Sequence, residues 1–247
     1  MLEKVDGVIL KTQDYGETHK IITIYSRKLG KISTLARGAK KTKSRMAAVT
    51  QPFIYGNFFV YLNKGLSTIQ QGEIEYSFRA IREDIFKTAY TAYITELTDK
   101  IVDPQITDPF LFEELYQTMS WIEEHEDVEI PIMMYELKMF VKGGFGPMVN
   151  GCANCNNKEF PYAFSIAEGG LLCKRCRYLD EKAIPLPDSV SKLLHLFTAV
   201  ELKRIGTISV KSENRQLIRK ILDAYYEQYG GYFLKSKRFL RQLDLLK

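Results

Sequence analysis

The fold is decided by residues 19–37, which read HKIITIYSRKLGKISTLAR. Two runs rich in β-branched and aromatic residues, 19–26 and 31–37, flank a short connection that contains Gly30. Such residues favour strands, and a short connection with a glycine is typical of a hairpin. This segment therefore predicts two neighbouring β-strands.

Three more segments of the same kind lie outward from this hairpin, at residues 5–11, 53–62 and 67–75. Five strands in so short a region fit a small closed barrel. The OB-fold is a five-stranded barrel that binds oligonucleotides, although an SH3-like barrel would give a similar pattern. We therefore predict a barrel, with the OB-fold favoured by the charge pattern described below.

After residue 79 the apolar residues recur every three or four positions, which indicates helices. The expected helices are 81–101, 110–126, one that begins at Pro131, one capped by Asp188 or Ser189, and one that starts after Ser212. The predicted fold class is α+β, an N-terminal five-stranded OB-fold barrel followed by an all-helical domain with an inserted four-cysteine zinc-finger element. The predicted domains are 1–79 for the barrel, 80–147 and 183–247 for the two parts of the helical domain, and 148–182 for the zinc finger.

Four cysteines lie within one short segment, with two residues inside each pair and 17 residues between the pairs. This spacing brings two thiolate pairs together from two tight turns, as tetrahedral zinc requires. We predict one structural Zn²⁺ ion, because four protein ligands leave no open position for a substrate. A disulfide or redox pair and an iron–sulfur cluster remain alternatives. The predicted ligands are Cys152, Cys155, Cys173 and Cys176.

Charge is distributed unevenly along the chain. Residues 18–72 contain ten Lys or Arg and no Asp or Glu, whereas residues 96–136 contain twelve acids and a single lysine. A basic segment of this kind favours binding to a polyanion, and residues 37–45 form a basic loop whose side chains can reach phosphates. Aromatic residues in the following strand, about half of them expected to face outward, could stack on unpaired bases. The predicted DNA contacts are Lys28, Lys31, Arg37, Lys40, Lys41, Lys43 and Arg45, and a possible second basic face comprises Lys235, Lys237, Arg238 and Arg241.

Motifs of catalysis are not found in the sequence. It has no phosphate-binding loop and no dinucleotide fingerprint, and its three histidines are scattered. The acids at 113–114 and 123–129 are interpreted as solvated helix faces. We therefore predict a binding protein and not an enzyme.

Several short segments resemble the RecO family of bacterial recombination mediators, in particular its zinc-containing Gram-positive members. The resemblance rests on the order of these segments together with the four cysteines. They are GVIL at 7–10, YGE at 15–17, LG at 29–30, ARGAK at 36–40, GFGP at 144–147 and LKSKRFL at 234–240.

The resemblance implies a function in DNA repair and recombination, through the RecF pathway. It implies binding to single- and double-stranded DNA, annealing of complementary strands, and contact with RecR and with the C-terminal tail of single-stranded DNA-binding protein. It implies an indirect action on RecA, which is loaded onto the coated strand. With no signal peptide or membrane-length apolar run in the sequence, we expect a cytoplasmic, nucleoid-associated protein. A Mg²⁺-dependent DNA-processing enzyme and a zinc-stabilised adaptor that binds only proteins are the alternative functions.

Overall fold

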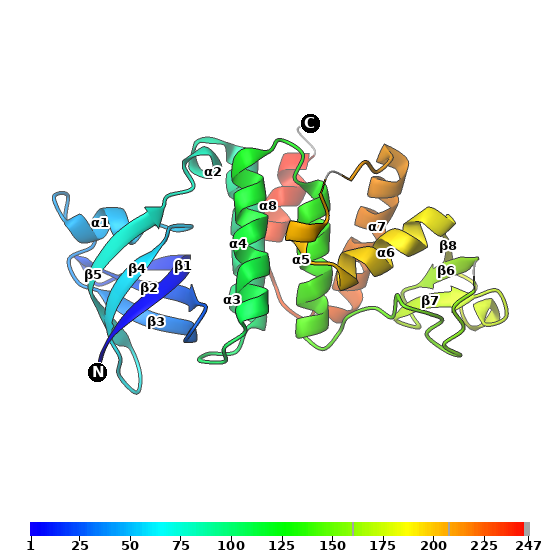
Figure 1. Cartoon of the computed structure of the whole chain (residues 1–247), viewed down its shortest axis with the longest axis horizontal. Helices are drawn as coiled ribbons and strands as arrows, with labels where there is room; N and C mark the ends of the chain where they lie inside the picture. Colours follow the sequence, from blue (N-terminus) through cyan, green and yellow to red (C-terminus); the bar gives the residue numbers. More distant parts are fainter. Residues whose placement is uncertain (160, 207, 245–247) are drawn as a thin grey trace. The chain divides into compact units, whose positions relative to one another are not determined.

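The computed structural model describes residues 1–159, 161–206 and 208–244. Contacts divide the chain into two compact units. The first unit contains Met1–Glu126 and the C-terminal segment that starts at Leu234, and the second contains Asp127–Phe233 (Figure 1). This division by contacts does not test the predicted boundaries after residues 79, 147 and 182, which stay predictions.

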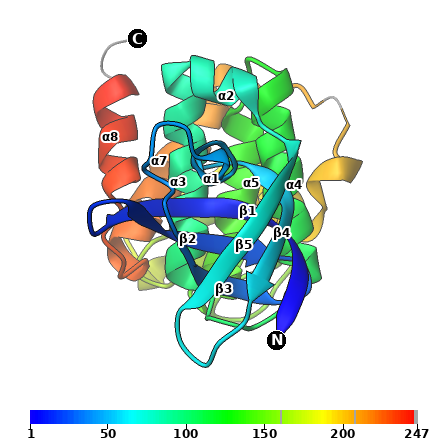
Figure 2. The same cartoon turned by 90° about the vertical axis from the view of Figure 1, so that its left-hand side faces the viewer.

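A closed five-stranded barrel forms the N-terminal part of the first unit (Figure 2). Its strand order is β1-β2-β3-β5-β4, and every neighbouring pair is antiparallel except β3 and β5. This OB-like barrel confirms the predicted fold class. The strands are β1 (Leu2–Tyr15), β2 (His19–Ser26), β3 (Gly30–Ala36), β4 (Tyr55–Tyr61) and β5 (Ser67–Tyr76).

Alternation along the strands fills the interior of the barrel. Ile22 and Ile24 on β2 and Phe58 and Val60 on β4 are fully buried, because side chains two positions apart point to the same face. Ile32 joins them from β3. Burial of each such side chain contributes roughly 1.5–3 kcal/mol relative to an exposed one. This core holds the strands, and the loops between them, in place.

A short helix, α1 (Arg45–Val49), lies between β3 and β4 and was not predicted. The Ser44 hydroxyl caps it by accepting a hydrogen bond from the Met46 N–H at 3.2 Å. Met46 also packs against the barrel core. Five residues are too few to show a helical period, so this helix depends on the barrel for its stability.

Four further helices complete the first unit: α2 (Arg79–Glu83), α3 (Ile85–Ile101), α4 (Pro109–Glu124) and α8 (Lys235–Asp244). The single helix predicted over 81–101 is wrong, because the chain leaves the helix at Asp84. The Asp84 carboxylate then caps α3 by accepting from the Lys87 N–H at 2.8 Å. No helix in the described part of the chain is both long and apolar enough to span a membrane.

Two acids that were expected on a solvated helix face have internal roles, so that interpretation is wrong for them. Glu114 is buried on α4. The Glu123 carboxylate accepts hydrogen bonds from the N–H groups of Ala80 and Ile81, at 2.9 and 2.8 Å, and so caps α2. The helix N-terminus is where a carboxylate is most favourable.

The second unit combines three helices with a small sheet of strand order β7-β6-β8. Pro131 is in the first turn of α5 and does not begin it, and Pro187 is the residue before α6, so Asp188 and Ser189 lie inside the helix and do not cap it. The elements are α5 (Glu129–Lys142), β6 (Tyr162–Ser165), β7 (Gly170–Cys173), β8 (Ile184–Pro185), α6 (Asp188–Ala199) and α7 (Ser212–Tyr229), with short 3-10 turns η1 (Arg177–Leu179) and η2 (Leu202–Arg204).

Candidate metal centre and nucleic-acid interface

The four cysteines lie on two tight turns of the second unit. In the first turn the Asn156 N–H donates to the Cys152 carbonyl at 2.8 Å, and Asn156 adopts a φ of 57°. In the second turn Cys173 ends β7, and the Cys176 N–H donates to the Cys173 carbonyl at 3.0 Å. Each turn therefore directs the two sulfurs of one Cys-x2-Cys pair to the same side.

The small sheet brings the two turns together. The β6–β7 hairpin pairs Tyr162 with Cys173. The Ala153 N–H of the first turn donates to the Leu171 carbonyl of β7 at 2.6 Å. Two cysteine pairs separated by 17 residues in the sequence are thus joined beside the end of one strand.

The sulfur positions fit one tetrahedral metal ion. All four Sγ atoms lie within 4.8 Å of one another, and Cys155 Sγ is 3.7 Å from Cys173 Sγ. A tetrahedral site with bonds of about 2.3 Å has sulfurs about 3.8 Å apart. A disulfide requires about 2.05 Å, so the four residues are free thiols and not disulfides. The cluster can hold a metal ion.

Burial and hydrogen bonding shift the pKa values of two of the thiols in opposite directions. Burial opposes ionisation of Cys173, but hydrogen bonds from the backbone of Cys176 and Arg175 and from Cys155 lower its pKa to about 6. The Asn154 side chain donates to Cys176 Sγ at 3.3 Å and favours that thiolate, whereas burial and the neighbouring thiols raise the pKa of Cys176 to about 12. Sulfurs that compete in this way become anionic together when a cation lies between them.

Basic side chains surround the second turn. Lys174, Arg175 and Arg177 are all exposed beside Cys173 and Cys176. Four thiolates around a divalent ion carry a formal charge of −2, which these cations offset. Within the described residues, the four cysteines are the one group of three or more His, Cys, Asp or Glu side chains placed to hold a metal.

The predicted DNA contacts lie on the first unit, and five of the seven are available at its surface. These five make no salt bridge with another described residue, so their charges are free to meet a ligand. Four lie between β3 and β4, and Lys28 lies in the turn before β3. They are Lys28, Arg37, Lys41, Lys43 and Arg45.

The basic loop predicted after β3 consists of turns followed by the start of α1. Ala39 is buried against the barrel core. The Gly38 N–H donates to His19 Nδ1 at 3.0 Å, and the Lys40 N–H donates to the Thr18 carbonyl at 3.0 Å. The barrel therefore holds these cations in a defined place. Lys28 lies at the other end of β3. The seven residues of this strand span roughly 20 Å.

The other two predicted contacts are already paired. Lys31 Nζ lies 3.5 Å from an Asp99 carboxylate oxygen and also donates to the Asp99 carbonyl, so it connects β3 to α3. Lys40 Nζ lies 2.9 Å from the Asp14 carboxylate, and this hydrogen bond lowers the pKa of Asp14. The structure does not present either lysine as a free surface charge.

The aromatic residues predicted to stack on bases are mostly used within the protein. Phe53 and Phe58 are buried. Tyr55 packs edge-on against a tyrosine of α4, with ring centroids 5.0 Å apart. Tyr61 is half exposed, and Phe59 is partly buried. The predicted stacking surface is therefore reduced to Tyr61 and part of Phe59.

The possible second basic face lies on α8. Lys235, Arg238 and Arg241 are exposed, but Lys237 is buried, with Nζ 5.4 Å from the centroid of the Tyr93 ring. Lys237 is thus part of the α3–α8 contact and not of a surface. Sequence reasoning also missed Asn154, whose contact with a cysteine sulfur was signalled only by its position between the first two cysteines.

These features define a class of protein, an OB-like barrel with free cations at its surface, a helical region and a four-cysteine centre. Sequence comparison identifies the family. A model described as Recombination protein O N terminal matches residues 1–78, and one described as Recombination protein O C terminal matches residues 82–238. The chain belongs to the recombination protein O family, which confirms the resemblance predicted from its short motifs.

Relatives match over almost the full length. A protein named DNA repair protein RecO from Oceanobacillus iheyensis is 60% identical over 244 residues, covering 99% of this chain and 95% of that protein. A protein of the same name from Bacillus cereus strain AH187 is 47% identical over 244 residues, covering 99% and 98%. One from Bacillus anthracis has the same identity and coverage. The chain is therefore a member of a DNA repair protein family.

Proposed function

We propose that this protein is a recombination mediator that binds single- and double-stranded DNA and anneals complementary strands without nucleotide hydrolysis. The observation that carries the proposal is the set of free cations held between β3 and β4 on an OB-like barrel, in a chain of this family. Arg37, Lys41, Lys43 and Arg45 are the principal contacts, and Lys28 extends the surface.

The composition of the barrel face explains how binding can leave bases free to pair. Neither β2 nor β3, all of whose residues are described, exposes a Phe, Tyr or Trp ring, and Tyr25 is buried. Phosphate contacts therefore supply most of the affinity, and they carry no sequence information. Two strands held by their backbones can meet through their exposed bases.

The proposed partners are those that the resemblance implies. In this proposal the protein acts with RecR and with the C-terminal tail of single-stranded DNA-binding protein, and so helps to load RecA onto coated single strands in the RecF pathway. It works in the cytoplasm, at the nucleoid. No bond is broken or formed in these steps, so the protein is a mediator and not an enzyme.

The metal in this proposal is one structural Zn²⁺ ion, held by Cys152, Cys155, Cys173 and Cys176. The closed set of four sulfurs and the 3.7 Å sulfur–sulfur distance support it. Zinc would join the two turns that flank the β6–β7 hairpin. Metal analysis of the purified protein tests this assignment, and a folded, oxidised, metal-free protein would contradict it.

The salt dependence of DNA affinity tests the binding surface. Replacing Arg37, Lys41 and Lys43 by Ala should weaken binding to single strands and make the slope of log K against log salt shallower by about 2, because each phosphate contact contributes about 0.7. The matched control replaces Lys182, Lys211 and Lys220, which are exposed on the second unit. The control should keep the slope of the unchanged protein. Equal slopes for both variants would remove the β3–α1 segment from the proposal.

Two simple assays separate the alternative functions. Cleavage of labelled DNA in the presence of Mg²⁺ would indicate a DNA-processing enzyme. Failure to form any DNA complex in a gel shift, with the protein folded, would indicate an adaptor that binds only proteins. The proposed mediator shifts DNA and leaves it intact.

A further inference from the structure

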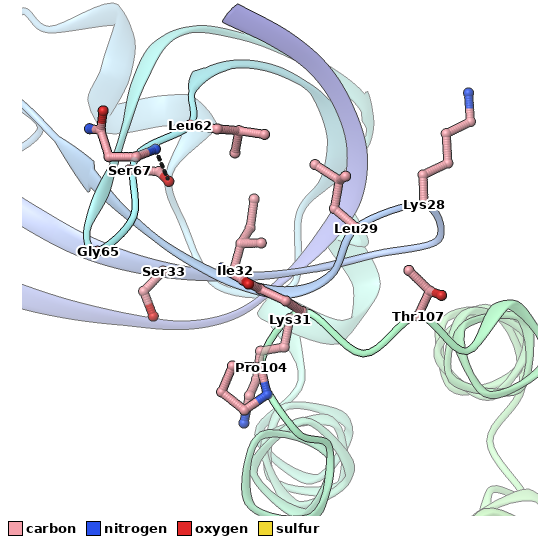
Figure 3. Close-up of a pocket in the computed structure, with 12 residues that line it drawn as sticks. Lys28, Leu29, Lys31, Ile32, Ser33, Leu62, Gly65, Ser67, Pro104 and Thr107 are labelled. Carbon is pink, nitrogen blue, oxygen red and sulfur yellow. Dashed lines mark hydrogen bonds between the residues drawn. The ribbon is translucent and has the colours of Figure 1, made fainter. Parts of the chain in front are cut away.

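A cavity of about 430 Å³ opens beside the barrel, within the first unit. Its walls come from the β2–β3 turn, the first half of β3, the β4–β5 loop and the α3–α4 loop. Leu29, Ile32 and Leu62 point toward one another and form an apolar wall (Figure 3). The volume is in the lower range for small-molecule sites and can enclose one nucleobase.

Polar groups of mixed character surround that wall. Ser33, Gln105 and Thr107 line the cavity, and their side chains have no hydrogen-bond partner among the described residues. Lys28 stands at the edge, and its amine points away from the apolar wall into solvent (Figure 3). Among the residues that the structure describes, no acid lines the cavity. The cavity therefore offers side chains that can both donate and accept hydrogen bonds, next to the positive charge of Lys28.

The backbone of the α3–α4 loop is held in an unusual conformation at Gln105. Gln105 has a φ of 60°, a region that residues other than glycine rarely adopt. Its N–H donates to the Lys31 carbonyl at 3.0 Å, and Pro104 pairs with Lys31 as an isolated parallel bridge. Gly30 allows this approach, because a Cβ there would overlap the Ile106 carbonyl. Backbone strain that is imposed in this way is concentrated at ligand sites.

We propose that this cavity binds one unpaired nucleobase of a DNA strand, whose phosphate then lies beside Lys28. The inference rests on the proposed DNA binding and deepens it, because it names a second, base-contacting site on the same barrel. The flat faces of the base pack against Leu29, Ile32 and Leu62, as bases pack between apolar side chains in base-binding pockets. Its edge faces Gln105.

The polar groups favour a base over an acidic peptide. A carboxamide offers a donor and an acceptor side by side, which matches the edge of adenine, and the two hydroxyls can serve either role. A carboxylate requires donors and positive charge alone. The charge of Lys31 is already neutralised by Asp99, which leaves Lys28 as the one unpaired cation of the described lining. A single nucleotide of a strand carries one negative phosphate, which the one positive charge of Lys28 can balance.

Binding to an abasic strand tests this proposal, with Gln105→Gly as the variant. Glycine accepts the positive φ without strain, so the variant keeps the backbone and removes only the side chain. The unchanged protein should bind an oligo-dA strand about tenfold more tightly than an abasic strand of equal length, because a two-point contact to a base edge contributes this much. Gln105→Gly should bind the abasic strand normally and lose most of the preference.

Lys41→Ala is the control, because it removes a phosphate contact far from the cavity. It should weaken binding to both strands by the same factor and leave the preference unchanged. The cavity proposal would be overturned if Gln105→Gly kept the full preference for oligo-dA over the abasic strand, or if the unchanged protein showed no such preference. The proposed function would still stand in both cases. If the unchanged protein binds no DNA, both fail.

An acidic C-terminal peptide provides the remaining outcome. If Gln105→Gly weakens binding of such a peptide while the preference for bases persists, the cavity belongs to a protein partner and the proposal is wrong. If the peptide binds both proteins equally and only the base preference falls, the cavity is assigned to the nucleotide.

Discussion

Asn154 lies between two of the predicted metal ligands and contacts a third. Its side chain donates to Cys176 Sγ at 3.3 Å, across the two turns. Outer contacts of this kind orient ligands and favour the thiolate form. The spacing of the four cysteines predicted their association, but no spacing shows which neighbouring side chain turns toward a sulfur.

Asn154→Ala should lower zinc affinity by about tenfold, because partners outside the metal's own ligands typically contribute this much. Competition with a zinc-binding dye measures the change. Lys158→Ala, an exposed change in the same segment, should leave the affinity as it was. Equal affinities for Asn154→Ala and the unchanged protein would show that the contact is incidental.

Glu136 and Arg219 form an ion pair inside the second unit. Both terminal guanidinium nitrogens of Arg219 donate to the Glu136 carboxylate, at 2.5 and 2.8 Å, and Glu136 is fully buried. Replacing Glu136 by a neutral residue removes this pairing from a buried site, while Asp223 still accepts a hydrogen bond from Arg219 at 3.0 Å. Sequence patterns gave no sign of this pair, because its members are 83 positions apart.

Glu136→Gln should therefore destabilise the second unit by about 2 kcal/mol, below the range for fully buried pairs because Arg219 is a third exposed. Urea unfolding followed by circular dichroism measures it. Lys220→Gln, an exposed change in the middle of α7, the helix that carries Arg219, should alter the free energy of unfolding by less than about 0.5 kcal/mol. A neutral Glu136→Gln would mean that the pair adds no net stability.

At the scale of elements, the strands were easier to predict than the short helices. The composition of residues 19–37 predicted β2 and β3 to within one residue, because β-branched residues mark strands directly. The α1 helix escaped because it is shorter than two helical turns. The break at Asp84 escaped because the apolar period continues across it from α2 into α3. The Asp84 side chain, which begins α3 as its cap, lies inside that period.

The cap on α2 is a test at this scale. Glu123→Gln should destabilise the first unit by about 1 kcal/mol, because a charged acceptor at a helix N-terminus is exchanged for a neutral one. Thermal unfolding measures the difference. Glu124→Gln is the matched control, since the neighbouring carboxylate is exposed at the end of the same helix. Identical unfolding of the two variants would contradict the assignment.

At the scale of the whole molecule, the chain leaves the first unit after Glu126 and returns to it at Leu234. The four-cysteine cluster lies within the second unit, and the free cations of the barrel lie within the first. The sequence alone assigned the two candidate sites to separate parts of the chain. It could not show that α8 joins the barrel-containing unit, because that contact links Ser236 with Glu96, which are 140 positions apart in the sequence.

Metal removal should therefore affect stability before it affects DNA binding. Cys152→Ser leaves three thiolates, and because metal binding contributes directly to folding, the second unit should lose several kcal/mol of stability. Calorimetry should show an earlier transition, while the affinity of the folded protein for single strands changes by less than about twofold. A large loss of affinity without any loss of stability would place the metal centre in the DNA interface.

The central claim is that free cations held between β3 and β4 bring two DNA strands together. The most direct test follows the annealing of complementary single strands by fluorescence, in the absence of nucleotide. The salt concentration is increased stepwise from a low value. The unchanged protein and the variant lacking Lys182, Lys211 and Lys220 should accelerate annealing equally. The variant lacking Arg37, Lys41 and Lys43 should be slower by about tenfold or more, because its phosphate contacts are lost. Equal acceleration by all three proteins would contradict the claim.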